Sequence, residues 1–279
     1  MAIKGMLWGL TAESAIHAGV GQLPAAVDLP VARERATGFP YIAASSLKGS
    51  LRAAAKEDWE NDEARLQQVF GKMDSAGALS IGDARLALLP VRSLQSSFFW
   101  VTCPYVLERL QRDAAMAGMV LPQLTAALPE IAKGTALGYK AETVYLEELS
   151  FTVQKHLQAE EAAAIFNVLW AHDSLKTRCP KQLLILNDEE FAYFARYALA
   201  VQAHNVLEAD TKTSKNLWYA ETLPPDSLLY TTVLVRRSQA AALTNTAQWL
   251  RERGYVQLGG GETTGLGWCA TAVCEGGEG

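Results

Sequence analysis

Five glycines lie within nine consecutive positions near the end of the sequence, in the stretch LGGGETTGLGW. They are Gly259, Gly260, Gly261, Gly265 and Gly267. Glycine adopts positive φ angles without steric cost and lets backbone N–H groups come close to a ligand, which suits phosphate binding. The stretch is not a P-loop, because it has no G-K-[ST] triplet, and too few residues follow it for a dinucleotide-binding βαβ unit. Without further context it is equally consistent with a structural turn.

His17 and Asp28 form a second candidate pair, eleven residues apart across a loop that contains glycine. An imidazole and a carboxylate that converge could carry out acid–base chemistry. A single histidine beside a strand is more often structural, however, and an aspartate in a loop commonly caps a turn. The spacing therefore identifies a candidate pair and leaves both interpretations open.

Common catalytic signatures are absent from the sequence, which has no G-x-S-x-G, no H-E-x-x-H and no C-x-x-C. The dipeptide His172-Asp173 suggests a metal-dependent phosphohydrolase. The remaining histidines do not lie at a spacing that would complete such a site; they are His17, His156 and His204. We therefore disfavour this class of enzyme.

Basic residues are concentrated between Leu29 and Lys56, although the formal net charge of the chain is −5. This segment has five basic residues and one acidic residue, Glu34, and so a net charge of +4; the basic residues are Arg33, Arg35, Lys48, Arg52 and Lys56. Acidic residues collect instead in the ranges 142–161 and 188–210. Clustered Lys and Arg favour phosphate binding, whereas a charge run alone is usually a solvated face.

Composition predicts a folded protein, since 49% of the 279 residues are hydrophobic and only 20% are charged. No run reaches the about 18 consecutive apolar residues of a membrane helix, and the first residues lack a signal-peptide cleavage site, so we expect a soluble, cytoplasmic chain without membrane contact. Four cysteines are too few to staple a chain of this length, and we expect buried thiols; they are Cys103, Cys179, Cys269 and Cys274.

The elements that must position these residues alternate between strand and helix. From Ser45 the sequence SSLKGSLRAAAKEDW predicts a helix with serine caps, a buried stripe and a basic stripe. Its buried stripe is Leu47, Leu51, Ala54 and Ala55, and its basic stripe is Lys48, Arg52 and Lys56. The other predicted strands are 6–17, 79–89, 149–153, 182–186 and 228–235, and the other predicted helices are 104–116, 159–171, one from about Asp188, and 240–253.

Two strand-like runs, 197–205 and 217–223, flank the polar segment VLEADTKTSKN and predict a long hairpin with a polar tip. The alternation favours two βαβ-type halves on one antiparallel or mixed sheet. No tandem repeat of 20 to 50 residues is visible, so a solenoid is excluded.

Three segments resemble the RAMP superfamily, and in particular the subunits that polymerise along the guide RNA in type III-B CRISPR (Cmr) complexes. They are VDLPVARERATGFPYIAASSLKGSLR at 27–52, LSIGDARLALLPVRSLQSSFFWVTCPYVLERLQRD at 79–113, and VQLGGGETTGLGW at 256–268. The resemblance is collinear from Leu7 to about Val273. It departs from the family pattern at Ala43-Ala44, where a Pro-Gly pair is common before the serines.

The resemblance implies an α+β fold with a ferredoxin-like or RRM-like core, which is a modified βαββαβ arrangement. It implies a single RAMP domain over residues 1–279. This domain includes a hairpin thumb at 197–223 and a glycine-rich loop at 256–268. It also implies that the chain grips the CRISPR RNA (crRNA) guide by its backbone, which carries no sequence information. The RNA-binding residues it implies are Ser46, Lys48, Arg52, Arg33, Arg35, Gly259, Gly260 and Gly261.

The same resemblance implies cleavage of the target RNA. Asp28 occupies the family's catalytic position, and an unperturbed aspartate with a pKa of about 3.9 is a weak base at neutral pH. We therefore expect Asp28 to hold a divalent metal, Mg²⁺ or Mn²⁺, that helps the ribose 2′-OH attack the adjacent phosphate. His17 falls where the family has a histidine near the cut. Glu221 falls in the thumb-base motif, in which Ala220 replaces a first acidic residue, so we rank Glu221 below His17.

The partners implied are crRNA, single-stranded target RNA, identical copies in a helical backbone and other Cmr subunits. Head-to-tail copies would form an open, heterologous assembly. Two alternatives stay open at this point: a structural filament subunit that does not cut, and a stand-alone crRNA-processing endoribonuclease of the same superfamily.

Overall fold

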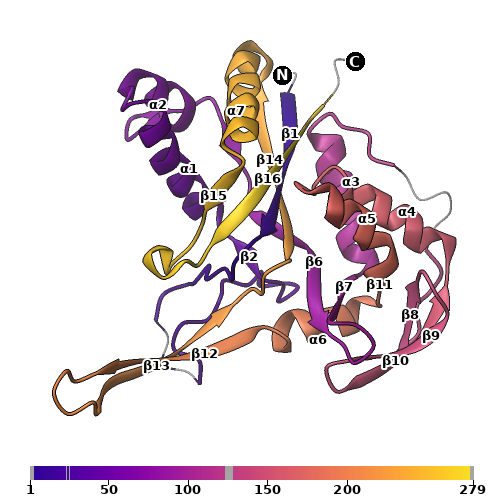
Figure 1. Cartoon of the computed structure of the whole chain (residues 1–279). Helices are drawn as coiled ribbons and strands as arrows, with labels where there is room; N and C mark the ends of the chain where they lie inside the picture. Colours follow the sequence, from indigo (N-terminus) through magenta and orange to yellow (C-terminus); the bar gives the residue numbers. More distant parts are fainter. Residues whose placement is uncertain (1–2, 23, 25, 123–127, 277–279) are drawn as a thin grey trace.

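The computed structural model describes residues 3–22, 24, 26–122 and 128–276 (Figure 1). Four antiparallel strands in the order β16-β1-β14-β6 form the centre of its main sheet. They are β1 (Ile3–Ala12), β6 (Ala84–Arg92), β14 (Leu228–Arg236) and β16 (Trp268–Glu275). A helix lies in each of two connections, α1 (Ala44–Asp58) between β1 and β6 and α7 (Ala240–Arg253) between β14 and β16. This order is the βαββαβ pattern of a ferredoxin-like core, so the predicted fold class is confirmed.

Short elements extend this core at its edges. They are β2 (Tyr41–Ile42), α2 (Glu63–Phe70), β3 (Gly71–Lys72), β4 (Ser75–Ala76), β5 (Ser80–Ile81) and β15 (Tyr255–Gln257), with single 3-10 turns at Arg237–Gln239 and Glu262–Thr264. β2 pairs with β6, β5 pairs with β14, and β3 pairs with β4 in a separate two-stranded sheet.

The chain between β6 and the hairpin builds a second region of the sheet, in the order β6-β7-β11-β8-β10-β9. Its elements are β7 (Phe98–Thr102), α3 (Pro104–Met116), β8 (Thr135–Gly138), β9 (Glu142–Leu146), β10 (Leu149–Lys155), α4 (Leu157–Phe166), α5 (Asp173–Gln182), β11 (Leu183–Ile185) and α6 (Asp188–Tyr197). β6 joins the two regions, because its first half pairs with β14 and its second half with β7.

Apolar side chains fill both faces of the sheet. Along β1, Met6 and Trp8 face a core that includes residues of α1 and α7, whereas Leu7 faces a second core with residues of α3, α4 and α5. This alternation follows from the two-residue period of a strand. Gly9 has to be glycine because a Cβ there would lie 2.2 Å from the carbonyl oxygen of Leu169.

The hairpin forms its own two-stranded sheet from β12 (Ala200–Leu207) and β13 (Ser214–Thr222), and it extends away from the rest of the molecule (Figure 1). It begins three residues later than the predicted start at Tyr197, because α6 runs to that residue from an N-cap at Asn187, whose side chain accepts a hydrogen bond from the Glu190 amide. A bulge between Val206 and Leu207 shifts the register near the tip.

Several predicted boundaries were wrong for local reasons. The 79–89 strand is divided into β5 and β6, and Asp83 in the break accepts a hydrogen bond of 2.8 Å from the Ala44 amide at the start of α1. The predicted cap of α1 by its serines is therefore incorrect. The predicted strand 6–17 ends at Ala12, and the predicted helix 159–171 ends at Phe166 and is followed by α5, which was not predicted.

Among the described residues, no helix is long and apolar enough to cross a membrane.

Candidate functional site

Asp28 lies beside the base of the hairpin, where the loop between β1 and β2 is hydrogen-bonded to β13. Leu29 and Ala220 form a parallel bridge. The Leu29 amide donates to the Tyr219 carbonyl at 3.0 Å, and the Glu221 amide donates to the Leu29 carbonyl at 2.9 Å. One residue earlier the Asp28 carboxylate accepts the Tyr219 amide at 2.8 Å. Asp28 is half-buried, so its side chain is anchored to β13 and still reaches solvent.

Glu221 holds the same loop from its other end. The residue is buried, and its carboxylate accepts hydrogen bonds from the Val31 amide at 3.0 Å and from the Arg33 guanidinium at 2.6 Å. Arg33 also donates to the carbonyls of Gly38 and Ala195, at 3.0 and 2.6 Å. The structure therefore surrounds Arg33 with protein acceptors, and its predicted contact with RNA stays a prediction.

His17 connects the hairpin base with the glycine-rich loop. Its Nδ1 lies 2.8 Å from the Glu221 carbonyl oxygen, and because a carbonyl only accepts, Nδ1 carries the hydrogen. The Gly260 amide donates to the His17 carbonyl at 2.9 Å. In the neutral ring the other nitrogen, Nε2, then has the free lone pair. His17 is half-buried, with Nε2 on the side of Gly19.

The glycine-rich loop is exposed at its tip and packed closely at its ends. Gly260 and Gly261 are exposed, and Gly259 is half-buried. Gly259 has a φ of 87°, and a Cβ there would lie 2.4 Å from the His17 carbonyl oxygen. Of the three amides predicted to bind phosphate, that of Gly260 is already donated to His17.

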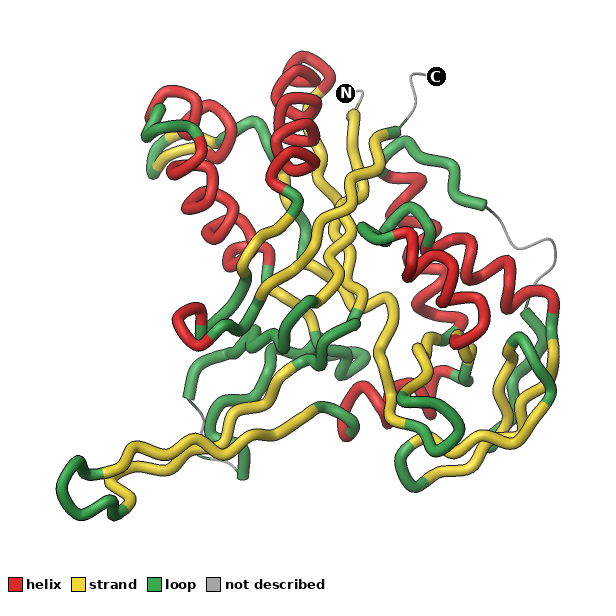
Figure 2. Tube along the Cα trace, in the orientation of Figure 1, coloured by secondary structure: helices red, strands yellow, loops and turns green. Residues whose placement is uncertain are grey.

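A third anchor joins the loop to α3. The Glu34 carboxylate accepts two hydrogen bonds from the Arg109 guanidinium, at 2.6 and 2.8 Å. Burial acts to raise the pKa of Glu34, but the hydrogen bonds from Arg109 and Thr37 outweigh it and hold that pKa below its ordinary value. Neighbouring residues 33 and 34 thus bind the hairpin base and α3 respectively. Figure 2 shows the loops of this region between the sheet and the hairpin.

Two residues of the basic stripe of α1, Lys48 and Arg52, lie elsewhere, toward β3 and the turn that follows it. Leu47, Leu51 and Ala55 are buried as predicted, whereas Ala54, predicted to be buried, is half-buried. Lys48 is half-buried, Ser46 is exposed, and Arg52 donates to the Gly71 carbonyl at 2.5 Å. Arg35 is exposed in the loop that carries Asp28. Among the described residues, no hydrogen bond or ion pair joins Lys48 or Arg52 to the glycine-rich loop, so the single groove that would connect them stays a prediction.

The described residues contain no cluster of three or more His, Cys, Asp or Glu side chains that could hold a metal ion. Mg²⁺ commonly binds through one or two carboxylates, with water and substrate phosphate completing its coordination. Asp28, with a carboxylate anchored at one oxygen and open to solvent, fits the part of a single protein ligand in such a shared site.

Other candidates have structural surroundings. The His172 imidazole Nε2 lies 2.8 Å from Glu13, and Asp173 pairs with Lys176 at 2.9 Å. Burial raises the pKa of the Cys179 and Cys269 thiols to about 12, so neither is a nucleophile at neutral pH.

The anchors of the Asp28 loop were not predicted from the sequence. Arg109 and Tyr219 lie far from Asp28 in the chain, and Tyr219 contributes only main-chain groups, its amide and its carbonyl. One sequence signal could have indicated the Arg109 contact. Glu34 is the only acidic residue in the basic segment 29–56, and an isolated carboxylate there suggests an ion pair with a basic residue.

Comparison with known proteins places this geometry in a family. The chain is 31% identical over 288 residues to the CRISPR system Cmr endoribonuclease Cmr4 of Pyrococcus furiosus, covering 98% of this chain and 97% of that protein. It is 25% identical over 269 residues to the CRISPR system CMR subunit Cmr4 of Saccharolobus solfataricus, covering 86% and 87%. The crystal structure of oligomeric Cmr4 from Pyrococcus furiosus superposes with a TM-score of 0.80 at 28% identity, covering 99% of this chain and 100% of that one.

A subunit in a cryo-EM structure of the type III-B Cmr-beta complex bound to cognate target RNA shares the fold, with a TM-score of 0.76 at 19% identity and 96% coverage of both chains. The sequence model of the RAMP superfamily matches residues 9–270. The chain therefore belongs to the RAMP superfamily.

Proposed function

We propose that this chain is a repeating backbone subunit of a type III-B CRISPR ribonucleoprotein, which binds the crRNA guide and cleaves the target RNA paired with it. Its similarity to the Pyrococcus furiosus endoribonuclease over nearly the full length of both chains supports this function. The observation that carries it is the position of Asp28, whose carboxylate is anchored at the base of a projecting hairpin, the same base that His17 contacts through the Glu221 carbonyl.

The guide is held through its phosphates. Lys48 and Ser46 at the start of α1, the exposed Arg35, and the exposed part of the glycine-rich loop are the groups available for this contact. Contacts to phosphate do not depend on base identity, so one protein accepts any guide, and base pairing selects the target.

Cleavage proceeds by attack of a ribose 2′-OH on the adjacent phosphorus. The new P–O2′ bond forms as the P–O5′ bond breaks, which leaves a 2′,3′-cyclic phosphate and a 5′-hydroxyl. The hairpin distorts the guide–target duplex so that one ribose is unstacked and its 2′-OH lies in line with the phosphate, and such alignment lowers the barrier. We assign to His17 Nε2, the nitrogen that Nδ1 leaves free in the neutral ring, the exchange of a proton with the leaving O5′ or the attacking hydroxyl.

Asp28 is the one protein ligand we assign to a divalent metal, Mg²⁺ or Mn²⁺. When bound, such an ion lowers the pKa of the hydroxyl that it contacts and stabilises charge on the phosphate. Glu221 acts on the position of Asp28, because its carboxylate holds Val31 and Arg33, at the far end of the same short loop.

Assembly and location complete the proposal. Copies of the chain associate head to tail along the guide, together with other Cmr subunits, as an open heterologous assembly. A solved relative is described as oligomeric, which supports this arrangement. We place the complex in the cytoplasm, where the four free cysteines of the chain would stay reduced.

The test is cleavage of a labelled, guide-matched RNA by the reconstituted complex containing wild-type chain or Asp28→Asn. We expect evenly spaced products with 2′,3′-cyclic phosphate ends from the wild type, loss of those products with EDTA, and no products from Asp28→Asn in complexes of normal size. Unchanged cutting by Asp28→Asn would remove Asp28 from the mechanism.

The same experiment separates the two alternatives. A wild-type complex that assembles on guide RNA and leaves the target intact would identify a purely structural subunit. Cleavage of precursor crRNA by the isolated chain in EDTA would identify a stand-alone processing enzyme.

A further inference from the structure

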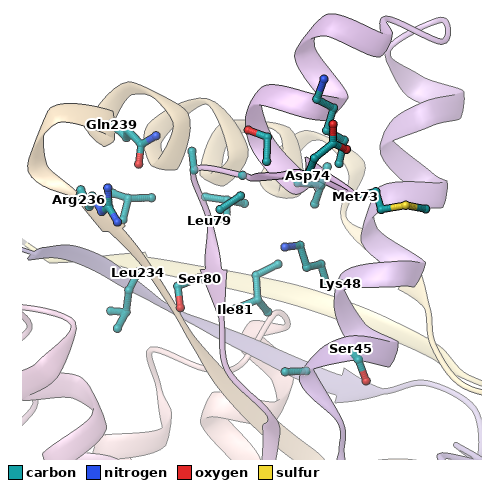
Figure 3. Close-up of a pocket in the computed structure, with 18 residues that line it drawn as sticks. Ser45, Lys48, Met73, Asp74, Leu79, Ser80, Ile81, Leu234, Arg236 and Gln239 are labelled. Atoms are coloured by element: carbon teal, nitrogen blue, oxygen red, sulfur yellow. The ribbon is translucent and has the colours of Figure 1, made fainter.

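A cavity of about 920 Å³ opens between α1, the turn joining β3 and β4, and the paired strands β5 and β14. Figure 3 shows its walls, with Lys48 on one side, Arg236 and Gln239 on the opposite side, and Met73 and Asp74 at the turn. The volume lies within the roughly 300–1,000 Å³ range of small-molecule sites. Asp28, His17 and the glycine-rich loop do not line it, so it is separate from the candidate cleavage site.

Three cations from three separate elements line the cavity: Lys48 from α1, Lys72 from β3 and Arg236 from β14. Within the described part of the chain, no hydrogen bond or ion pair engages any of these three side chains. Most arginines in the same part are paired, as Arg33, Arg52 and Arg109 show. Among the described residues that line the cavity, one is acidic, Asp74. An excess of unpaired positive charge in a chain of net charge −5 points to an anionic ligand.

The walls also provide apolar contact surface. Leu79 is buried, Ile81 and Leu234 are half-buried, and the side chain of Met73 is fully exposed at the tip of the turn. A thioether and aliphatic side chains pack against the flat face of a base without selecting its identity. Ser45, Ser80 and Gln239 add polar groups that can bond a base edge or a ribose hydroxyl.

We propose that this cavity binds a nucleoside phosphate, with the phosphate between Lys48, Lys72 and Arg236 and the base against Met73, Leu79 and Ile81. The inference rests on the proposed function, since a nucleotide of the RNA strand held by α1 is the expected source of this group. The proposal adds two groups to the RNA-binding surface that were not predicted from the sequence. They are the turn at 72–74 and Arg236 at the end of β14. The alternative source of the same chemistry is a free nucleotide.

The first measurement is the affinity of the purified full-length chain for a fluorescent single-stranded RNA, by anisotropy across a salt series. In the double variant Lys72→Ala and Arg236→Ala we expect a roughly tenfold or greater loss of affinity. The slope of log affinity against log salt should become shallower by about 0.7 for each phosphate that the variant no longer neutralises. The matched control is the double variant Arg178→Ala and Lys181→Ala, which removes one arginine and one lysine from the exposed surface of α5.

A gain-of-affinity variant excludes misfolding as the cause. Asp74→Asn removes the acidic side chain from the described lining of the cavity and should tighten RNA binding with a steeper salt slope. A damaged fold would not bind more tightly. Equal affinities for wild type, Asp74→Asn and the Lys72/Arg236 double variant would overturn the proposal.

The second measurement locates the ligand directly. A photoreactive amino acid at Met73 should crosslink to the RNA, whereas the same amino acid at Leu94, which is 81% exposed at a distance along the chain, should not. Competition with nucleoside monophosphates distinguishes the sources: crosslinking of RNA that resists excess monophosphate supports the strand, and a crosslink to the monophosphate alone supports a free nucleotide. No crosslink to either at position 73 would refute the site.

Failure of this proposal and failure of the proposed function give different results. If the cavity variants bind RNA as the wild type does and the complex still cuts its target through Asp28, only the cavity proposal falls. If the wild-type complex neither retains guide RNA nor cuts, the proposed function itself falls.

Discussion

The guanidinium of Arg33 and the carboxylate of Glu221 lie 2.6 Å apart, although 188 residues separate them in the chain. Their side chains are 22% and 10% exposed, so the pair is largely shielded from water. The contact fixes one end of the loop whose other end is Asp28, and Glu221 therefore affects Asp28 through the backbone of residues 29–31.

Replacing Glu221 with Gln should slow target cleavage roughly 10- to 100-fold, because small displacements of reacting groups have effects of this size. Affinity for the guide should stay at the wild-type value. Single-turnover cleavage by the assembled complex measures the rate. Glu147→Gln, which disrupts the exposed pair with Arg92, is the control and should cut normally. A wild-type rate for Glu221→Gln would show that the anchor does not position Asp28.

The hydrogen bond between the Asp28 carboxylate and the Tyr219 amide should give two substitutions at position 28 different effects on the hairpin base. Asp28→Asn keeps an oxygen that can accept the Tyr219 amide, whereas Asp28→Ala does not. Both should abolish cleavage, but only Asp28→Ala should speed amide exchange at Tyr219. Hydrogen–deuterium exchange with mass spectrometry reports that difference, and slow exchange at Tyr219 in Asp28→Ala would contradict this hydrogen bond.

His17 should be sensitive to the space beside its ring. A Cβ at Gly19 would lie 2.6 Å from Nε2, so Gly19→Ala should displace the ring and lower the cleavage rate as His17→Ala does, by about 100-fold or more. Gly21→Ala is the control, since nothing lies within 4 Å of its added Cβ. Its φ of 92° adds backbone strain that Gly19→Ala does not have, so normal cleavage by Gly21→Ala would assign the loss in Gly19→Ala to the contact with the His17 ring. Equal rates for the two glycine variants would argue against this role.

The Glu34–Arg109 contact should make the free energy of unfolding depend on pH in the acid range. The folded-state pKa of Glu34 is lowered, so the unfolded chain binds a proton at higher pH than the folded one does. The stabilisation is therefore complete above the unfolded carboxyl pKa of about 4.3 and is lost as pH falls through the folded value. Urea unfolding from pH 7 to pH 3 should show a smaller decline for Glu34→Gln than for wild type. An equal decline of the unfolding free energy in the two proteins would contradict a stabilising role of the Glu34 carboxylate.

Two glycines in one loop should differ sharply when replaced by alanine. Gly265 and Gly267 both have positive φ, 81° and 84°, so each substitution costs about 1–2 kcal/mol of backbone strain. At Gly267 the new Cβ would also lie 2.0 Å from the Leu258 carbonyl oxygen, whereas at Gly265 nothing lies within 4 Å. Thermal unfolding should therefore show a much larger loss for Gly267→Ala. Similar melting temperatures would mean that the loop relaxes freely.

Sequence reasoning found the elements whose signals are local. Pro104 marks the first turn of α3, and that helix was predicted with its observed bounds. The buried face of α1 followed from its periodicity. Two-residue strands such as β3 and β4 are too short to show a period, and α5 contains Pro180, so these elements escaped prediction.

The site was predictable only in part for a related reason. His17 and Asp28 could be named by residue type, yet each is held by a main-chain group of the hairpin base far along the chain, Asp28 by the Tyr219 amide and His17 by the Glu221 carbonyl. Backbone contacts carry no side-chain signature in a sequence. The resemblance to RAMP proteins indicated Glu221, and the structure adds its contacts with Val31 and Arg33.

At Asp28 a side-chain oxygen takes the place in the strand ladder that a main-chain carbonyl would otherwise occupy. A tilt of the hairpin therefore moves this oxygen with it, without a hinge between them. A force that bends the hairpin, from a bound duplex or from a neighbouring copy, would therefore also shift the Asp28 carboxylate. The position of the hairpin and the position of this carboxylate are coupled.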